Sequence, residues 1–260
     1  MRESFSSLWA HRELIVSFAM RDIKARYKQT ALGVAWAVLQ PASMMVVFTL
    51  VFSLFAKIPS DGLPYPIFAY SGLIFWTFFA STVGGGTTAM VANSALIRKI
   101  YFPRATLIIS VVIAGALDLV IAASLFLGMM FYYKVALTVA AFWVLPLLIL
   151  QMLFAFAVSC LTSAAHVNFR DIGHGLPLVL QLWMFASPVA YPISVIPGWL
   201  LPFYLLNPMA SIIDGYRRAL LHGSAPDFEA VAFSAVCVLL FTGLALAVFR
   251  RAERTFADVI

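Results

Sequence analysis

A long apolar run broken by prolines constrains the fold of this chain more than any other feature. Residues 172–213 contain no Asp, Glu, Lys or Arg, and these 42 residues would suffice for two bilayer crossings at about 20 residues each. Prolines recur within the run every four to six residues: Pro188, Pro192, Pro197, Pro202 and Pro208. Each proline removes a backbone donor, and the carbonyls that it frees need partners inside hydrocarbon. We therefore predict one crossing over residues 172–188 and a re-entrant helical hairpin over residues 189–216.

The composition predicts an all-α polytopic membrane protein. The chain is 63% hydrophobic and 11% charged, whereas soluble proteins are about 25% charged. Because uncharged runs of 20 or more residues recur, we expect residues 31–260 to form a single domain with six transmembrane helices. The five other spans are predicted at residues 31–55, 67–91, 105–131, 138–164 and 231–249.

The first 30 residues combine six Lys and Arg with apolar side chains at roughly helical spacing. This pattern favours an amphipathic helix that lies in the membrane interface on the cytoplasmic side. The alternative is a solvated basic leader that only fixes the orientation of the first span.

Charge distribution predicts that both termini are cytoplasmic. With that orientation, 13 of the 17 Lys and Arg lie on the inner side, and only Lys57, Lys134, Arg217 and Arg218 fall in outer loops. Both termini can lie on one side only if residues 172–213 cross an odd number of times. One crossing and a hairpin satisfy that condition.

The sequence contains none of the common catalytic motifs. It has no Gly-rich phosphate loop ending in Gly-Lys-Ser/Thr, no Gly-x-Ser-x-Gly elbow and no His-Glu-x-x-His pair. His166 and His174 flank one loop, but two histidines without a third ligand do not make a metal site. We therefore expect no catalytic residue, metal or cofactor in this chain, and a partner must supply the energy for any work.

Asp118 is the only acidic residue near the middle of a predicted span. Acidic residues inside membranes are candidates for function. No basic residue shares its predicted depth, so we expect no ion pair within one copy. A protonated or hydrogen-bonded carboxyl inside the bundle is one interpretation, and the proton relay of an ion-coupled transporter is the other.

Five segments in this order resemble the membrane subunit of ABC-2 type exporters of O-antigen, capsular polysaccharide and teichoic acid. The segments are RDIKARYKQTALGVAWAVLQP (21–41), LIRKIYFPR (96–104), NFRDIGH (168–174), SPVAYP (187–192) and NPMASIIDGYR (207–217). The resemblance covers essentially the whole chain.

The resemblance implies a homodimer that binds two copies of a cytoplasmic ABC ATPase, which holds ATP and Mg²⁺. It implies transport of an undecaprenyl-pyrophosphate-linked polysaccharide, with O-antigen the leading candidate, across the bacterial inner membrane through a channel between the two copies. Export of a small molecule or lipid by a member of the same superfamily is the alternative.

The resemblance also assigns roles to individual residues. Contacts with the ATPase are predicted for Arg21, Asp22, Arg98, Lys99, Tyr101, Phe102, Pro103, Arg104, Phe169, Arg170 and Asp171. Aromatic rings that can stack on sugars are predicted at the channel and its periplasmic gate: Trp183, Phe185, Tyr191, Trp199, Phe203, Tyr204 and Tyr216. Arg26 and Lys28 are predicted to attract the lipid pyrophosphate. The alternative for the aromatic set is a membrane-interface belt, and for the basic loops it is ordinary connectors.

Overall fold

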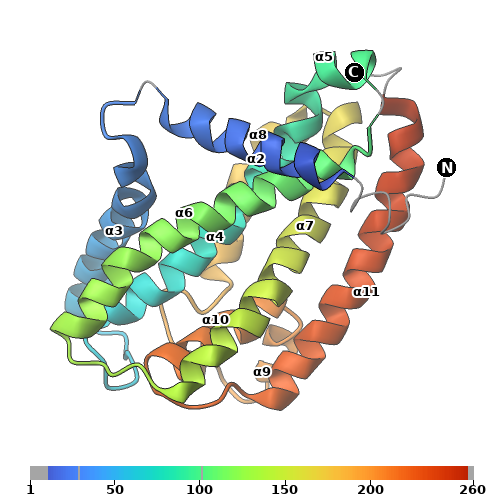
Figure 1. The fold of residues 1–260 in the computed structure, drawn as a ribbon. Coiled ribbons are helices and arrows are strands. Elements are labelled where there is room, and N and C mark those ends of the chain that lie inside the picture. The colour runs from blue at the N-terminus through green and yellow to red at the C-terminus, as the bar shows by residue number, and fades with distance from the viewer. Residues whose placement is uncertain (1–10, 29, 101, 257–260) are drawn as a thin grey trace.

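The computed structural model describes residues 11–28, 30–100 and 102–256, and these residues form helices and loops without strands (Figure 1). Residues 1–10 of the predicted interface segment and Tyr101 therefore lie outside the described residues. The elements are α2 (Arg12–Tyr27), η1 (Gly33–Ala35), α3 (Trp36–Phe48), η2 (Thr49–Phe55), α4 (Tyr65–Ala92), α5 (Ser94–Lys99), α6 (Ala105–Tyr132), η3 (Val139–Trp143), α7 (Val144–Asn168), α8 (Asp171–Phe185), η4 (Ile193–Val195), α9 (Leu201–Tyr204), α10 (Pro208–Leu220), α11 (Phe228–Ala252) and η5 (Glu253–Thr255).

Five helices in the described part of the chain are long and apolar enough to cross a membrane. They cover Gly33–Phe55, Tyr65–Ala92, Ala105–Tyr132, Val139–Asn168 and Phe228–Ala252, within a few residues of the spans predicted from the sequence. The sixth predicted span corresponds to α8. With 15 residues, α8 is about 22 Å long, which is less than the roughly 30 Å thickness of a bilayer core.

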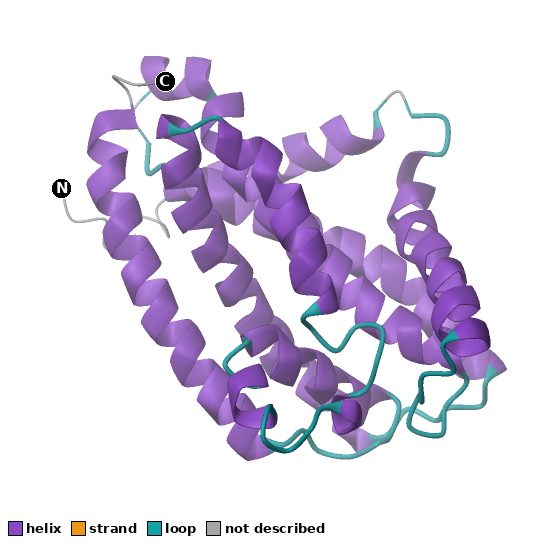
Figure 2. Ribbon diagram, turned by 180° about the vertical axis from the view of Figure 1, so that it is seen from behind, coloured by secondary structure: helices purple, strands orange, loops and turns teal. Residues whose placement is uncertain are grey.

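The bundle has two ends, which we call the α5 end and the α10 end. Figures 1 and 2 show α2, α5 and the last turn of α11 at the α5 end, and the loops around α9 and α10 at the other. Helix α8 runs from the α5 end toward the α10 end. The chain then turns through residues 186–207 and enters α10 before α11 leads back to the α5 end.

Helix α4 forms the centre of the core because it packs against both α6 and α7. Small residues permit this close approach. A Cβ at Gly86 would lie 2.5 Å from the Ser159 side chain of α7, and one at Gly85 would lie 3.0 Å from Val111 of α6. Glycine and serine at such positions let two helix backbones pack tightly.

Helix α2 packs along α6 with Phe18 and Ala19 buried, while its basic residues Arg21 and Lys24 are exposed. Figure 1 shows it crossing the bundle near the α5 end, at a steep angle to α3. A helix with an apolar contact on the bundle and cations on its outer side is suited to a membrane interface.

Candidate functional site

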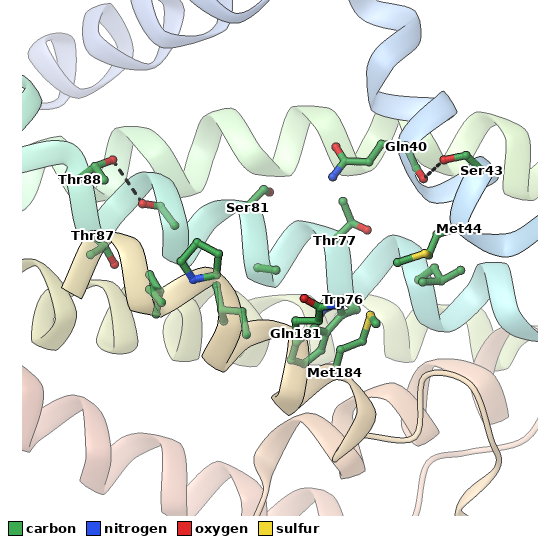
Figure 3. A pocket seen from close by; sticks show the side chains of 17 residues that line it. Gln40, Ser43, Met44, Trp76, Thr77, Ser81, Thr87, Thr88, Gln181 and Met184 are labelled. Carbon is green, nitrogen blue, oxygen red and sulfur yellow. Dashed lines mark hydrogen bonds between the residues drawn. The ribbon is translucent and has the colours of Figure 1, made fainter. Parts of the chain in front are cut away.

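A groove with a volume of about 630 Å³ runs along α4 between α3 and α8. Figure 3 shows side chains from all three helices lining it, including Gln40 and Ser43 from α3 and Gln181 from α8. Among its described lining residues none is charged, and the polar ones are Gln40, Ser43, Thr77, Ser81, Thr87, Thr88 and Gln181. The groove can therefore offer hydrogen bonds to an elongated neutral ligand without binding it through charge.

These polar residues were not among the site residues predicted from the sequence, although their spacing along α4 is regular. Thr77, Ser81, Gly84 and Thr88 follow one another at intervals of four, three and four residues, so they lie on one face of α4. In a span that is otherwise strongly apolar, a stripe of hydroxyl groups indicates a surface that faces a polar partner.

A recess of about 60 Å³ extends the groove toward α6. It shares Gln40, Thr77 and Ser81 with the groove and reaches Asp118. The acidic residue singled out in the sequence therefore lies beside the groove.

The prediction that Asp118 has no basic partner within one copy is wrong. Arg26 forms an ion pair with one carboxylate oxygen, and the Tyr27 hydroxyl donates a hydrogen bond to the other. The error came from placing the basic segment at the interface only. Helix α2 instead follows α6: the Ser110 hydroxyl donates to Asp22 at 3.3 Å, and the end of α2 lies against the middle of α6.

Arg26 is thus engaged by a carboxylate, whereas Lys28, the other residue predicted to attract a pyrophosphate, is exposed where α2 ends. The two residues lie in different environments, and the structure does not bring them together on one free cationic surface.

Side chains donate most of the hydrogen bonds to the backbone carbonyls of the proline-rich turn that follows α8. Six consecutive carbonyl oxygens, from Ala186 to Tyr191, each accept a hydrogen bond. The donors are Asn207 Nδ2 to Ala186, the Val189 N–H to Ser187, Tyr65 Oη to Ala190, and the Arg217 guanidinium to Pro188, Val189 and Tyr191. A broken helix can lie within an apolar environment when protein groups provide such partners.

This turn corrects the expected position of Arg217. The charge count placed its side chain in an outer loop beside that of Arg218, but Arg217 is only 3% exposed and lies inside the protein. Proximity in sequence misled the prediction: successive residues of a helix point about 100° apart, so one can be buried while its neighbour is not.

Asn207 ties the turn to the start of α10. Its side-chain oxygen accepts from Trp183 Nε1 at 3.0 Å and from the Met209 N–H at 3.1 Å, so the residue also caps α10. Its Nδ2 donates to the Ser187 hydroxyl at 2.9 Å. Trp183 is consequently fixed at the end of α8, where its ring packs against Phe79 and other aromatic rings of the core.

Five of the six other aromatic residues predicted at the gate fall into two groups. Phe185, Trp199 and Phe203 are exposed, the last two by 75% and 67%. Tyr191 and Tyr204 are half-buried and joined by a hydrogen bond between their hydroxyls at 3.2 Å.

Tyr216 lies in the core. It is 0% exposed, its ring stacks on that of Phe75 at 3.5 Å, and its hydroxyl donates to Gln151 at 2.9 Å. In this arrangement it presents no surface to a ligand.

The two short loops predicted to contact a partner both lie at the α5 end. Arg98, Lys99, Phe169, Arg170 and Asp171 are exposed there, Phe169 by 67%. They lie on α5 and on the turn between α7 and α8. These side chains form a mixed charged and aromatic surface.

The other residues of the first loop are held within the chain. Phe102 is buried against Phe18 of α2, with ring centroids 5.7 Å apart, and Pro103 is buried beside it. The Arg104 N–H donates to the Glu253 carboxylate at 3.3 Å, and its guanidinium donates to the Glu253 carbonyl.

Arg21 and Asp22 form an ion pair on α2 at 2.8 Å. Through Phe102 and Arg104, the loop before α6 is held between α2 and η5, the first and last described elements of the chain.

Comparison with known proteins matches residues 13–221 to the family model for ABC-2 type transporters. The chain is 34% identical over 260 residues to an O-antigen export system permease protein RfbA of Myxococcus xanthus, covering 97% of each chain. It is 26% identical to an O-antigen export system permease protein RfbA of Klebsiella pneumoniae, covering 95% of each. It is also 23% identical to the polysialic acid transport protein KpsM of Escherichia coli, covering 90% of this chain and 91% of that one. With its helical spans and near full-length relatives, this chain belongs to the ABC-2 type transporter membrane family.

Proposed function

We propose that this chain is the membrane subunit of an ATP-driven exporter that moves an undecaprenyl-pyrophosphate-linked polysaccharide, most specifically O-antigen, across the bacterial inner membrane. The observation that carries the proposal is the groove along α4, in a chain whose near full-length relatives are named as O-antigen export permeases. Sugar hydroxyls both donate and accept hydrogen bonds. The side-chain amides of Gln40 and Gln181 can do both, and the hydroxyls of Ser43, Ser81, Thr87 and Thr88, which donate to helix carbonyls, can still accept.

Two copies facing each other would complete the path. The described residues that line the groove all come from α3, α4 and α8. Exposed apolar residues of α8 flank it: Leu178, Val179 and Leu182. A two-fold dimer that buried these residues would place one groove against the other, as a self-complementary interface requires. The exposed rings of Trp199 and Phe203 would then stand near the exit, where sugars can stack on them.

The energy would come from two copies of a separate ABC ATPase that bind ATP and Mg²⁺. The exposed side chains of Arg98, Lys99, Phe169, Arg170 and Asp171 supply a mixed surface for it at the α5 end. An aromatic anchor such as Phe169 surrounded by charged groups is typical of an interface centre and its rim.

The membrane orientation follows from the same geometry. Helix α2 and η5 lie at the α5 end, which we assign to the cytoplasm together with both termini. Helix α8 would be the sixth crossing and is shorter than the others. Residues 189–216 would re-enter the membrane from the periplasmic side. The carbonyl partners of residues 186–191 support this arrangement, because they remove the need for water at that depth.

The test is reconstitution with a cognate ABC ATPase. We expect the pair to hydrolyse ATP and to restore polysaccharide export in a strain that lacks its own exporter. Replacing Arg170 and Asp171 by alanine should abolish export while the membrane subunit is still made. Export that persists without any ATPase would refute the proposal, and intact export in the double variant would refute the assigned contact surface.

A further inference from the structure

Arg217 uses every donor of its guanidinium group. Nε, Nη1 and Nη2 together carry five N–H bonds, and five acceptors surround them. The acceptors are Ser71 Oγ at 3.4 Å from Nε, the carbonyls of Pro188 at 2.5 Å and Tyr191 at 3.3 Å from Nη1, and the carbonyls of Val189 at 2.6 Å and Phe68 at 3.4 Å from Nη2.

The buried charge is stabilised by dipoles and an aromatic face. Among the described residues no carboxylate lies within salt-bridge distance of Arg217. Its Cζ lies 3.7 Å from the centroid of the Phe68 ring, a cation–π contact. A buried cation without a counter-ion is costly unless hydrogen bonds surround it, so the cluster of carbonyls and Arg217 depend on each other.

The acceptors of Arg217 belong to two different elements. Phe68 and Ser71 lie on α4, and residues 188–191 form the turn after α8. The groove lining begins at Leu73 on α4 and ends at Met184 on α8. Arg217 therefore joins these two walls one turn beyond the point at which the groove ends.

We propose that Arg217 is the positioning residue that holds the 187–191 turn against α4, so that this turn closes the groove at its α10 end. The role of the turn as an outer gate rests on the proposed function. The adjacent Arg218 has no such part: it is half-buried, with its side chain 41% exposed, and it pairs with Asp214 at 2.7 Å within α10.

Only arginine satisfies all five acceptors. Lysine keeps the charge but has three donors on one atom, and glutamine has two. Arg217→Lys and Arg217→Gln should therefore both release the turn, because each leaves buried carbonyls unpaired. A role that needed only positive charge would instead be rescued by lysine.

Cysteine labelling measures this release directly. In a chain whose Cys160 and Cys237 are replaced by alanine, Ala190→Cys places a thiol in the turn at a position that is 2% exposed. Right-side-out membrane vesicles are treated with a membrane-impermeant maleimide. We expect labelling about tenfold faster with Arg217→Gln or Arg217→Lys than with the native arginine, since several charge-assisted hydrogen bonds are lost. Arg218→Gln is the matched control and should not change the rate.

A second variant reaches the same contact from α4 without altering any charge. A Cβ at Gly72 would lie 2.7 Å from Arg217 Nη2 and 2.9 Å from the Val189 carbonyl, so Gly72→Ala should also accelerate labelling. Gly243→Ala on α11, where a Cβ meets open space, is its control. If the Arg217 variants do not accumulate, the Gly72 variant decides the matter.

Trp199→Cys, at a position that is 75% exposed, serves as the reference thiol and should label equally in every background. Unchanged labelling of the 190 thiol in the Gly72 and Arg217 variants would overturn the proposal, as would equal acceleration by Arg218→Gln. In the reconstituted exporter, the released turn should lower export at least about tenfold relative to ATP hydrolysis. Failure of the proposed function would look different: the wild type would give no export with the ATPase, whereas the labelling result would stand.

Discussion

Asp118 illustrates how an acidic side chain is accommodated in an apolar helix. Its two oxygens bind Arg26 and Tyr27, both from the last turn of α2. A relay for protons needs further titratable groups, and the recess beside Asp118 is otherwise lined by Gln40, Thr77, Ser81 and apolar residues. The pair therefore fits an attachment between α2 and α6 better than a proton pathway.

Asp118→Asn should weaken this attachment without stopping transport. The amide keeps an acceptor for Tyr27 but loses the charge that faces Arg26, so we expect a loss of roughly 1–2 kcal/mol of stability. Thermal unfolding of the purified protein in detergent measures the loss, and the export assay should retain most of its activity. A well-folded but inactive Asp118→Asn protein would favour an ion-coupled transporter.

Gly84 and Gly86 are two residues apart on α4 but have different surroundings. A Cβ at Gly86 would meet the Ser159 side chain at 2.5 Å, whereas one at Gly84 would meet nothing within 4 Å because that residue lines the groove. Gly86→Ala should therefore cost about 1–3 kcal/mol of stability by overpacking the contact between α4 and α7.

Gly84→Ala should leave the melting temperature unchanged or slightly raised, since alanine is the better helix former. Comparison of the two melting temperatures in detergent checks both expectations. Equal destabilisation by the two substitutions would show that backbone freedom, rather than close packing, explains the glycines.

At the scale of elements, η5 and the residue that follows it hold the loop that precedes α6 through contacts with Arg104. Glu253 accepts the Arg104 N–H, and the Arg104 guanidinium lies over the Phe256 ring at 5.7 Å. Burial raises the pKa of Glu253 above its ordinary value of 4.5, and it does so against the opposing charges of Arg104 and Arg250. Folding thus favours the protonated carboxyl.

A raised pKa has a definite consequence for stability. The contribution of Glu253 is complete below its ordinary pKa and is lost as the pH rises through the raised value. Glu253→Gln, which resembles the protonated form and can still accept from Arg104, should be at least as stable as the wild type at neutral pH. Melting temperatures of both proteins, measured from below the ordinary pKa of Glu253 up to neutral pH, test this. The stability advantage of Glu253→Gln should grow as the pH rises. A wild-type advantage that increases with pH would contradict the expectation.

At the scale of the whole molecule, the groove is what two facing copies would join into one path. Thr77 and Thr88 contribute hydroxyls to its α4 wall, and valine has nearly the same shape without the hydroxyl. Thr77→Val with Thr88→Val should reduce polysaccharide export about tenfold, because both hydroxyls face the groove and would bind substrate. Stability and ATP hydrolysis should change little, since the Thr88 hydroxyl loses only bonds to carbonyls of its own helix at 3.2 and 3.3 Å. Export and ATP hydrolysis measured in the same vesicles test this. A parallel loss of both activities would indicate damage to the fold.

Much of the architecture was predictable because each long helix carries its own signal. The spans at 31–55, 67–91, 105–131, 138–164 and 231–249 agree with the structure within a few residues, since hydropathy over about 20 residues is a local property. The candidate site was less predictable. The two loops at the α5 end and the aromatic residues of the turn stay predictions. Tyr216 lies in the core, and the polar stripe on α4 was not predicted.

What the sequence determined by itself was therefore the class of protein, the helices that it forms and the need of a proline-rich segment for hydrogen-bond partners. Only the tertiary structure decided which residues provide those hydrogen-bond partners. Arg217 reaches Ser71 across 146 residues, and Arg26 reaches Asp118 across 92. A buried polar group can bind whichever complementary group the packing brings within about 3 Å, and that choice is not encoded in any one segment of the chain.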